Sequence, residues 1–332
     1  MNHIMVVCDE EQDYASKLVD YLNLKEGFPF DVRYFAELDQ LKTFVEKQMV
    51  DVILCSEKYL KDIEGIEWVK LIVLQESESY SDAKAEKLWK YQSCEKMIKE
   101  LMKILSGSSM VYSFSSRRKP MKLIALYSPV KRCLQTTLGI LLGQHLAKKG
   151  KSLYISLESY SVISEVLNLP FQKDLSDILY ALNGNIKNGK LYLESVVMEA
   201  GGMDVLPPMN NQSDLMSITP GEWIEFLKKI EQETDYEYVI LDLSDSVQGI
   251  EQILRQSNII YQVKNEGFIS DKKIQKYQIQ MRQSGYEDVV NRIRFVAVKD
   301  YKGFPETINR IKNTEFGDLV KELLKEEVYA SE

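Results

Sequence analysis

The 332-residue chain is poor in the residues that most often hold metals or transfer protons. It contains two histidines, His3 and His145, so catalysis or metal binding by imidazole is not expected. Four cysteines are present and none is spaced as a CxxC pair, so we expect free thiols in a reducing compartment. They are Cys8, Cys55, Cys94 and Cys133.

Long hydrophobic runs are also absent. No apolar stretch approaches the ~20 residues that a membrane-spanning helix needs. The N-terminal stretch "MNHIMVVCDEEQDY" turns acidic at once, which predicts a first strand and not a signal peptide. The 42 basic and 50 acidic residues give a net charge of −8, so composition makes no general case for nucleic acid or anionic membranes. We therefore expect a cytoplasmic protein without a transmembrane segment.

Hydrophobic residues make up 45% of the chain, which is enough for real cores, and the length suits two domains. The stretch "SGSSMVYSFSSRRKP" is rich in serine and ends in proline, so residues 107–120 are predicted to form a linker. This linker separates a first domain, residues 1–106, from a larger second domain, residues 121–332.

Both domains alternate short apolar strands with helical patterns. In the first, the predicted strands include "HIMVV", "DVRYF", "VDVILC" and "VKLIVLQ", and "SCEKMIKELMKIL" is a predicted closing helix. In the second, the predicted strands are "KLIALYS", "SLYISLE", "MDVLP", "YEYVILDLS", "NIIYQV" and "IRFVAVK". This alternation predicts an α/β protein in which each domain is doubly wound, with a parallel sheet covered on both faces.

Charged residues follow the strands of the first domain. "VVCDEE" places Asp9, Glu10 and Glu11 after the first strand. "DVILCSE" ends the third strand at Ser56, and "KLWKYQS" places Lys90 after the fifth. The segment resembles a response-regulator receiver, in which an acidic pair, an aspartate and a lysine take these places. The resemblance implies a flavodoxin-like fold.

The chemistry of that family is phosphoryl transfer to the aspartate, with a metal ion held by the acidic cluster. Ser56 stands at the acceptor position, so no acyl-phosphate can form. We expect no phosphotransfer and no metal, with Asp9 and Glu10 as solvated carboxylates at the loop ends. What the resemblance then leaves is the fold and its surfaces, which can dimerise or bind partners.

The stretch "LYSPVKRCLQTTLG" lies between a predicted strand and a predicted helix. This is the arrangement of a P-loop, in which glycines turn backbone N–H groups toward phosphates, a lysine meets the β- and γ-phosphates and a hydroxyl binds Mg²⁺. The loop resembles the K-G-G-x-G-K-[ST]-[ST] pattern of the ParA/MinD family. The residues at and beside the motif positions are Ser128, Val130, Lys131, Arg132, Leu134, Gln135, Thr136 and Thr137.

Only the two threonines match that pattern. Lysine, arginine and leucine replace the three glycines, Val130 replaces the early lysine and Gln135 replaces the phosphate lysine. A left-handed backbone at a former glycine costs ~1–2 kcal/mol, and the lost charge-assisted hydrogen bond is worth ~1.5–3 kcal/mol. We therefore expect no ATP hydrolysis and weak binding of Mg²⁺–ATP at most, and no other cofactor.

Further landmarks follow in the same order as in that family. "KSLYISLES" puts Ser156 at the position of a catalytic aspartate and Glu158 at a second acidic position. "YEYVILDLSDS" matches the Walker B strand and supplies Asp242, and "FVAVKD" supplies Lys299 near the expected adenine. The resemblance covers residues 122 to about 317 and implies a P-loop NTPase-like fold without ordinary ATPase chemistry.

A receiver-like domain joined to a ParA/MinD-like domain is the layout of TadZ/CpaE-type proteins, which place and assemble the Flp (Tad) pilus and secretion machine at the cell pole. The resemblance implies a non-catalytic localisation scaffold that is brought to the pole, or to the inner face of the membrane, by protein partners. We also expect a homodimer. Two alternatives stay open: a ParA/MinD-like positioning switch that still binds ATP, and an atypical response regulator.

Two predicted helices bear on the choice of partner. "SDKKIQKYQIQMRQ" carries Lys272, Lys273, Lys276 and Arg282 against one aspartate; such a face can bind phosphate backbones, but we interpret it as solvated and see no strong nucleic-acid signal. The acidic tail has an apolar stripe, which predicts a helix docked on its own domain and not on anionic lipid. The stripe consists of Phe316, Leu319, Val320, Leu323 and Leu324.

Overall fold

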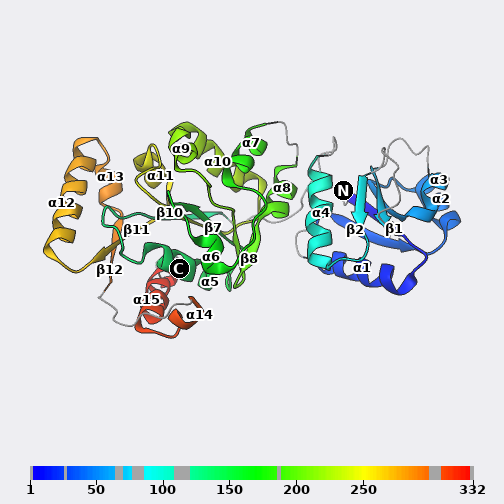
Figure 1. The fold of residues 1–332 in the computed structure, drawn as a ribbon, viewed down its shortest axis with the longest axis horizontal. Coiled ribbons are helices and arrows are strands. Elements are labelled where there is room, and N and C mark those ends of the chain that lie inside the picture. Colours follow the sequence, from blue (N-terminus) through cyan, green and yellow to red (C-terminus); the bar gives the residue numbers. More distant parts are fainter. Residues whose placement is uncertain are drawn as a thin grey trace. The chain divides into compact units, whose positions relative to one another are not determined.

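A computed structural model describes residues 3–25, 28–63, 70–76, 86–107, 120–184, 188–298 and 308–329. The chain forms two compact units (Figure 1). The first consists of Met1–Arg117 with Ile186–Ser195, and the second of Arg118–Asn185 with Val196–Glu332. The predicted linker falls outside the described residues except at its ends, and so does Lys299.

The first unit is built on a five-stranded parallel sheet with the order β2-β1-β3-β4-β5, which is the flavodoxin-like order. The strands are β1 (His3–Cys8), β2 (Phe30–Phe35), β3 (Val52–Ser56), β4 (Lys70–Gln75) and β5 (Glu86–Trp89). The helices are α1 (Gln12–Leu24), α2 (Leu38–Lys47), the 3₁₀ turn η1 (Glu57–Tyr59), α3 (Leu60–Ile63) and α4 (Cys94–Ser106).

Alternate residues of β1 enter two different cores, because successive side chains of a strand point to opposite faces. Met5 and Val7 pack with residues of α1 and α4, whereas Ile4 and Val6 pack with residues of α2 and α3. The sheet is thus covered on both faces, as the sequence predicts.

One helix of the first unit comes from a distant part of the chain. The helix α8 (Gly189–Val196) follows second-unit residues in sequence, yet Leu191 is fully buried in the core that contains α4. Beside it, the buried Asn188 amide donates a hydrogen bond to the Leu105 carbonyl at 3.3 Å. The predicted boundary at residue 121 placed this segment in the second domain, so that assignment is corrected for 186–195.

The second unit has a seven-stranded sheet with the order β12-β11-β6-β10-β7-β9-β8, parallel except where β8 meets β9. The strands are β6 (Lys122–Leu126), β7 (Ser152–Leu157), β8 (Met198–Ala200), β9 (Met203–Val205), β10 (Tyr238–Leu243), β11 (Ile259–Asn265) and β12 (Ile293–Val298). Both units are therefore α/β folds with parallel sheets, which confirms the predicted fold class.

Most helices of this unit lie in the connections between its strands, and the last two follow β12 (Figure 1). They are α5 (Gln135–Leu146), α6 (Ile163–Leu167), α7 (Leu175–Asn183), α9 (Gln212–Ser217), α10 (Pro220–Glu233), α11 (Ile250–Gln256), α12 (Phe268–Gln283), α13 (Glu287–Val290), α14 (Ile308–Ile311) and α15 (Glu315–Tyr329).

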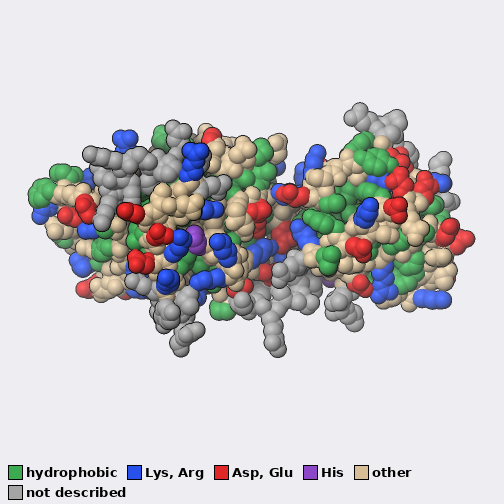
Figure 2. Space-filling view, turned by 90° about the horizontal axis from the view of Figure 1, so that it is seen from below, with side chains coloured by type: hydrophobic (Ala, Val, Ile, Leu, Met, Phe, Trp, Pro, Cys, Tyr) green, Lys and Arg blue, Asp and Glu red, His purple; other side chains and the backbone are tan. Residues whose placement is uncertain are grey.

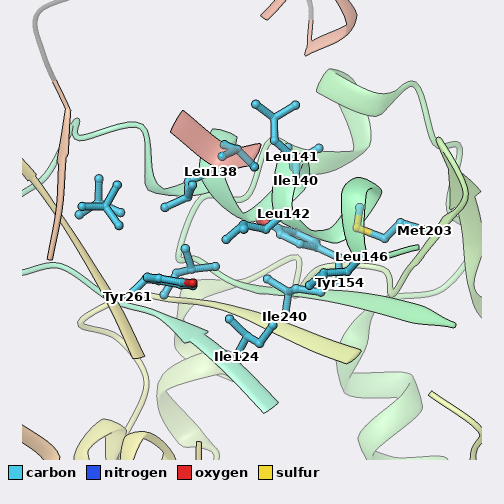
Figure 3. Packing of buried hydrophobic residues seen from close by; sticks show 14 of the residues in the cluster. Ile124, Leu138, Ile140, Leu141, Leu142, Leu146, Tyr154, Met203, Ile240 and Tyr261 are labelled. Atoms are coloured by element: carbon cyan, nitrogen blue, oxygen red, sulfur yellow. The ribbon is translucent and has the colours of Figure 1, made fainter. Parts of the chain in front are cut away.

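Helix α5 lies tightly against the sheet, with its leucines above Tyr154 and Ile240 (Figure 3). The approach depends on glycine, because a Cβ atom at Gly139 would stand 2.9 Å from the Tyr154 ring. A larger residue would push α5 outward together with the loop that precedes it. The sequence thus places the start of α5 close to the ends of β6 and β10.

The C-terminal helix α15 contributes Phe316, Val320 and Leu324 to the same core. The predicted docking of this helix on its own domain is therefore confirmed. Within the described ranges, no helix combines the length and the apolar character that crossing a membrane requires.

Candidate functional site

The loop after β6 borders a cavity of ≈ 230 Å³ at the carboxyl ends of β6 and β7. In parallel α/β sheets this edge is where ligands bind. Most of the residues singled out in the sequence meet here, whereas Thr137 is half-buried on α5 and does not line the cavity. Those that line it are Ser128, Lys131, Arg132, Gln135, Thr136, Ser156 and Glu158.

The loop keeps a backbone shape that glycine normally supplies. Arg132 and Leu134 both have φ of 60°, in the left-handed region, at a cost of ~1–2 kcal/mol each. Ser128 fixes the start of the loop, since its hydroxyl donates to the Val263 carbonyl at 2.5 Å and accepts from the Val130 N–H at 3.1 Å. This strain lowers the stability of the loop.

Asp242 lies at the end of β10, fully buried, and its carboxylate is surrounded by three uncharged donors. The Gln135 amide donates to Oδ1 at 2.7 Å. The hydroxyls of Thr136 and Tyr154 each donate to Oδ2 at 2.7 Å. Burial raises the pKa of Asp242, and these three hydrogen bonds oppose that shift.

This network uses the groups that a P-loop offers to its ligand. The amide nitrogen of Gln135 has two N–H donors, and the second goes to the Leu243 carbonyl at 2.9 Å. No N–H donor of Gln135 is left for a phosphate, whereas the Thr136 hydroxyl donates its proton to Asp242 and keeps its oxygen lone pairs. In the part of the chain that the structure describes, no three His, Cys, Asp or Glu side chains are grouped to hold a metal ion. At Gln135 the loop does not fit a phosphate as the lysine of a P-loop holds it.

The nearest lysine of the loop is also engaged. Lys131 pairs with Asp245 at 2.9 Å, and the Tyr127 hydroxyl donates to the other oxygen of Asp245 at 2.7 Å. Burial alone would raise the pKa of Asp245, but the hydrogen bonds from Lys131 and Tyr127 outweigh it and hold the pKa below its usual value. Because Lys131 and Asp245 are both more than half exposed, the pair is worth little to stability.

Glu158 is the ionisable group of the cavity whose charge changes near neutral pH. Burial raises its pKa to about 7; repulsion from Asp242 adds to the shift, and Lys131 reduces it. Ser156, at the position of a catalytic aspartate, is buried and accepts a hydrogen bond from the Ser161 hydroxyl at 2.8 Å. A serine there cannot orient a water as a carboxylate does.

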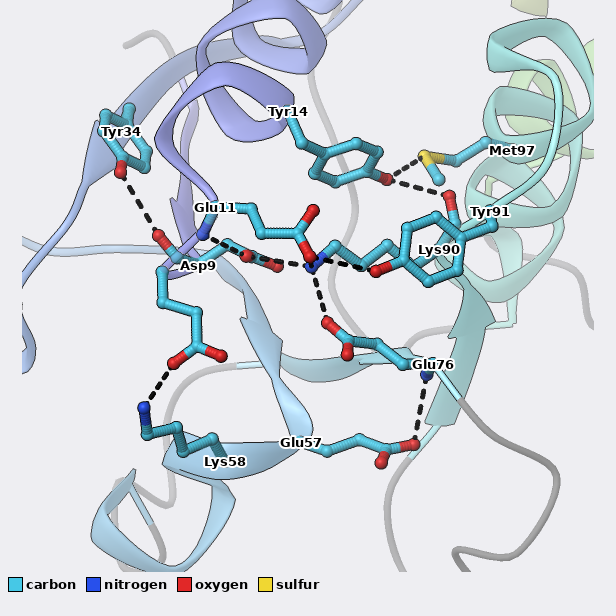
Figure 4. Close-up of polar contacts among 11 residues, drawn as sticks. Asp9, Glu11, Tyr14, Tyr34, Glu57, Lys58, Glu76, Lys90, Tyr91 and Met97 are labelled. Carbon is cyan, nitrogen blue, oxygen red and sulfur yellow. Dashed lines mark hydrogen bonds and ion pairs between the residues drawn. The ribbon is translucent and has the colours of Figure 1, made fainter.

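The first unit contains a second cluster, at the carboxyl ends of β1, β3, β4 and β5 (Figure 4). Lys90 is fully buried, and its ammonium group lies 3.0 Å from Asp9 Oδ1 and 2.5 Å from Glu76 Oε1. The rings of Tyr14 and Tyr91 stand 5.1 and 5.5 Å from the same nitrogen. Burial alone would lower the pKa of Lys90, but the hydrogen bonds to Glu76 and Asp9 raise it.

This cluster differs from the expectation of solvated loop carboxylates. Asp9 is fully buried, because it is the counterion of Lys90, whereas Glu10 is exposed and pairs with Lys58. Ser56 is buried at the end of β3. Lys90 thus occupies the space between the carboxylates as an internal cation.

This chain is similar to several solved structures. A putative plasmid partition protein from Borrelia burgdorferi B31, bound to AMPPNP, is 13% identical over 63% of this chain and 100% of its own, with a TM-score of 0.46. A ParA family ATPase from Chlorobium tepidum TLS is 14% identical over 60% and 81%, with a TM-score of 0.47. The cell division ATPase MinD from Pyrococcus furiosus is 16% identical over 61% and 98%, with a TM-score of 0.46.

No protein-family model matches the chain, and no curated protein matches it. At the identities and TM-scores of the solved structures, similarity is limited to the general path of the chain. The function must therefore be argued from the side chains of this chain.

Sequence reasoning missed three residues of the candidate sites. Tyr154 carries a hydroxyl group on β7, a strand that is buried along its whole length. A buried hydroxyl needs a hydrogen-bond partner inside the protein, and this is the one signal that the sequence offers. Asp245 follows Asp242 by three residues, and Glu76 follows β4. Nothing in the spacing indicates that Asp245 would bind Lys131 or that Glu76 would bind Lys90.

The raised pKa of Glu158 predicts a pH-dependent stability. The folded state holds this proton more tightly than the unfolded chain, so stability falls as pH rises from about 4.5 to about 7. We expect a loss of about 1–2 kcal/mol, allowing for partial exposure to water. Urea unfolding of Glu158→Gln should show a stability gain over wild type that is larger at high than at low pH. Glu165→Gln, an exposed change on α6, should show no such dependence; equal pH profiles of wild type and Glu158→Gln would contradict the assignment.

Proposed function

We propose that this protein is a non-catalytic localisation scaffold of Flp (Tad) pilus or related secretion-system assembly, acting through protein–protein contacts. Support comes from the order of the degenerate P-loop landmarks and from the union of two α/β units in one chain. The observation that carries the non-catalytic part is the Asp242 network. Gln135 stands at the position of the phosphate lysine, and both of its N–H donors are bound by Asp242 and the Leu243 carbonyl.

A second candidate function is a positioning switch that still binds ATP. One observation favours it: the loop keeps left-handed residues at Arg132 and Leu134 and borders a cavity large enough for phosphate groups. Lys131 and Arg132 also bring positive charge to the start of α5, where an anion is favoured. The occupied donors of Gln135 weigh more, because they remove the specific contact that a phosphate needs.

For the first unit we propose a receiver-like fold without phosphotransfer. Ser56 cannot form an acyl-phosphate, and its burial limits access for a kinase. Lys90 is neutralised by Asp9 and Glu76, so it has no free charge to offer to a phosphoryl group. These observations disfavour an atypical response regulator.

We also propose that the chain forms a homodimer, since a scaffold gains reach when it presents two copies of each binding surface. Light scattering of the full chain at micromolar concentration should give twice the monomer mass, with or without ATP. A monomer under both conditions would count against this proposal.

The scaffold role is tested in the source organism with a fluorescent fusion and a deletion strain. We expect the deletion to abolish pilus assembly and the fusion to gather at a pole. Because no nucleotide cycle is required, Thr136→Val and Asp242→Asn should restore both properties. A deletion strain with normal pili would refute the pilus role, and failure of both variants, at normal protein level, would favour the ATP switch.

A further inference from the structure

Helix α12 exposes apolar side chains on its outer face. Its inner side is formed by Ile274 and Met281, which are 6% and 2% exposed. Phe268, Ile269 and Ile279 are 71%, 66% and 47% exposed. At 100° per residue these three lie on the side of the helix opposite to the buried pair. Exposed apolar patches mark interaction sites when they are large and contiguous, and Phe268 and Ile269 adjoin at the start of this face.

Lysines separate the apolar residues on this outer face. Lys272 and Lys276 fall between Phe268 and Ile279 in the helical spacing, and Lys272 lies 5.4 Å from the Phe268 ring. Lys272 contacts the Gln275 side chain, and no carboxylate in the described ranges pairs with either lysine. Figure 2 shows hydrophobic and basic side chains together at the end of the second unit where Figure 1 places α12.

The arrangement is that of two apolar anchors with positive charge between them. Phe268 and Ile279 are eleven residues apart, or about 16 Å along the axis. Aromatic and aliphatic anchors of this kind supply most of the binding energy of an interface, and the charges between them select the partner and speed its approach. We propose that the outer face of α12 binds an amphipathic helix of another protein, with carboxylates between two apolar anchors.

Other occupants fit the face less well. A second copy of the same face would set lysine against lysine, and like charges across an interface disfavour it. Nucleic acid would use the lysines but not the exposed phenylalanine and isoleucines. An interfacial membrane helix needs a continuous apolar face, whereas here the apolar residues alternate with lysine and glutamine.

The inference rests on α12 alone and goes beyond the pilus role, since it names the surface and the chemistry of the partner. The probe is a labelled synthetic helical peptide about 16 residues long, with leucines at the two anchor positions and glutamates between them. A second peptide has lysines in place of the glutamates. Fluorescence anisotropy with the full chain should show micromolar binding of the acidic peptide and at least tenfold weaker binding of the basic one.

Two double variants test the two kinds of contact. Phe268→Ser with Ile279→Ser should weaken binding of the acidic peptide at least tenfold. Lys272→Glu with Lys276→Glu should reverse the preference, so that the basic peptide binds more tightly. Tyr180→Ser removes an equally exposed aromatic from α7 and should change nothing.

The changed residues lie on the solvent side of the helix, so the variants should fold, and circular dichroism will show whether they do. Equal binding by wild type and the serine variant would overturn the proposal. The proposal would also be overturned if wild type bound a DNA duplex or phosphatidylglycerol vesicles more tightly than the acidic peptide and the serine variant lost that binding.

Discussion

Replacing Lys90 with methionine is expected to lower the free energy of unfolding of the first unit by about 3–5 kcal/mol. The lysine and Asp9 are both fully buried, and their charged atoms are 3.0 Å apart. Removing one partner leaves the other as an uncompensated charge in a medium that solvates it badly. Among the described residues Asp9 Oδ2 has no hydrogen-bond partner, so once the ammonium group is gone the carboxylate keeps the Glu11 N–H, 2.9 Å from Oδ1.

The matched control is Lys58→Met, which breaks the exposed ion pair with Glu10. Exposed pairs contribute about 0–1 kcal/mol, so this variant should unfold close to wild type. Lys90→Met combined with Asp9→Asn should recover much of the loss, because both buried charges are then absent. The account of the cluster would be wrong if Lys90→Met and Lys58→Met proved equally stable in urea unfolding followed by tyrosine fluorescence.

Leu191→Ala is expected to destabilise the first unit by about 2–5 kcal/mol, although the segments on both sides of 186–195 belong to the second. Leu191 is fully buried in the core formed with α4, and a truncated side chain there loses contacts and leaves a cavity. Hydrogen exchange should therefore accelerate in α4 and β5. It should remain unchanged in β6 and β10.

Leu24→Ala provides the comparison, since Leu24 is 84% exposed on α1 and its loss should change stability by less than about 0.5 kcal/mol. Faster exchange in the second unit, with α4 unaffected by Leu191→Ala, would show that α8 belongs to that unit after all.

The two sheets could be predicted because their strands are short apolar runs bounded by polar residues, and alternation with helices leaves few other architectures. The place of α8 could not be predicted. Its sequence "GKLYLESV" indicates a helix with apolar residues, but it does not say which core receives Leu191. That choice is made by tertiary packing between segments that are far apart in sequence.

The site was predictable to the extent that parallel strands bring their carboxyl ends to one edge of a sheet. Gln135, Thr136, Ser156 and Glu158 line one cavity for that reason, with Asp242 beside them. The partners of the polar groups were not predictable, because Tyr154 and Asp245 are recognised only from the distances of their hydroxyl and carboxylate atoms. Arg132 and Leu134, at two of the three former glycine positions, adopt the left-handed backbone that the pattern of the loop indicates.

Calorimetry with Mg²⁺–ATP, paired with a phosphate-release assay, tests the central claim that this P-loop is no longer a working one. Loss of the lysine contact costs about 1.5–3 kcal/mol, and freeing Gln135 from Asp242 and from the Leu243 carbonyl adds about 0.5–1.5 kcal/mol for each hydrogen bond. The account predicts a dissociation constant weaker than about 100 µM and phosphate release no faster than in buffer. Low-micromolar binding, together with turnover that Asp242→Ala abolishes, would contradict it.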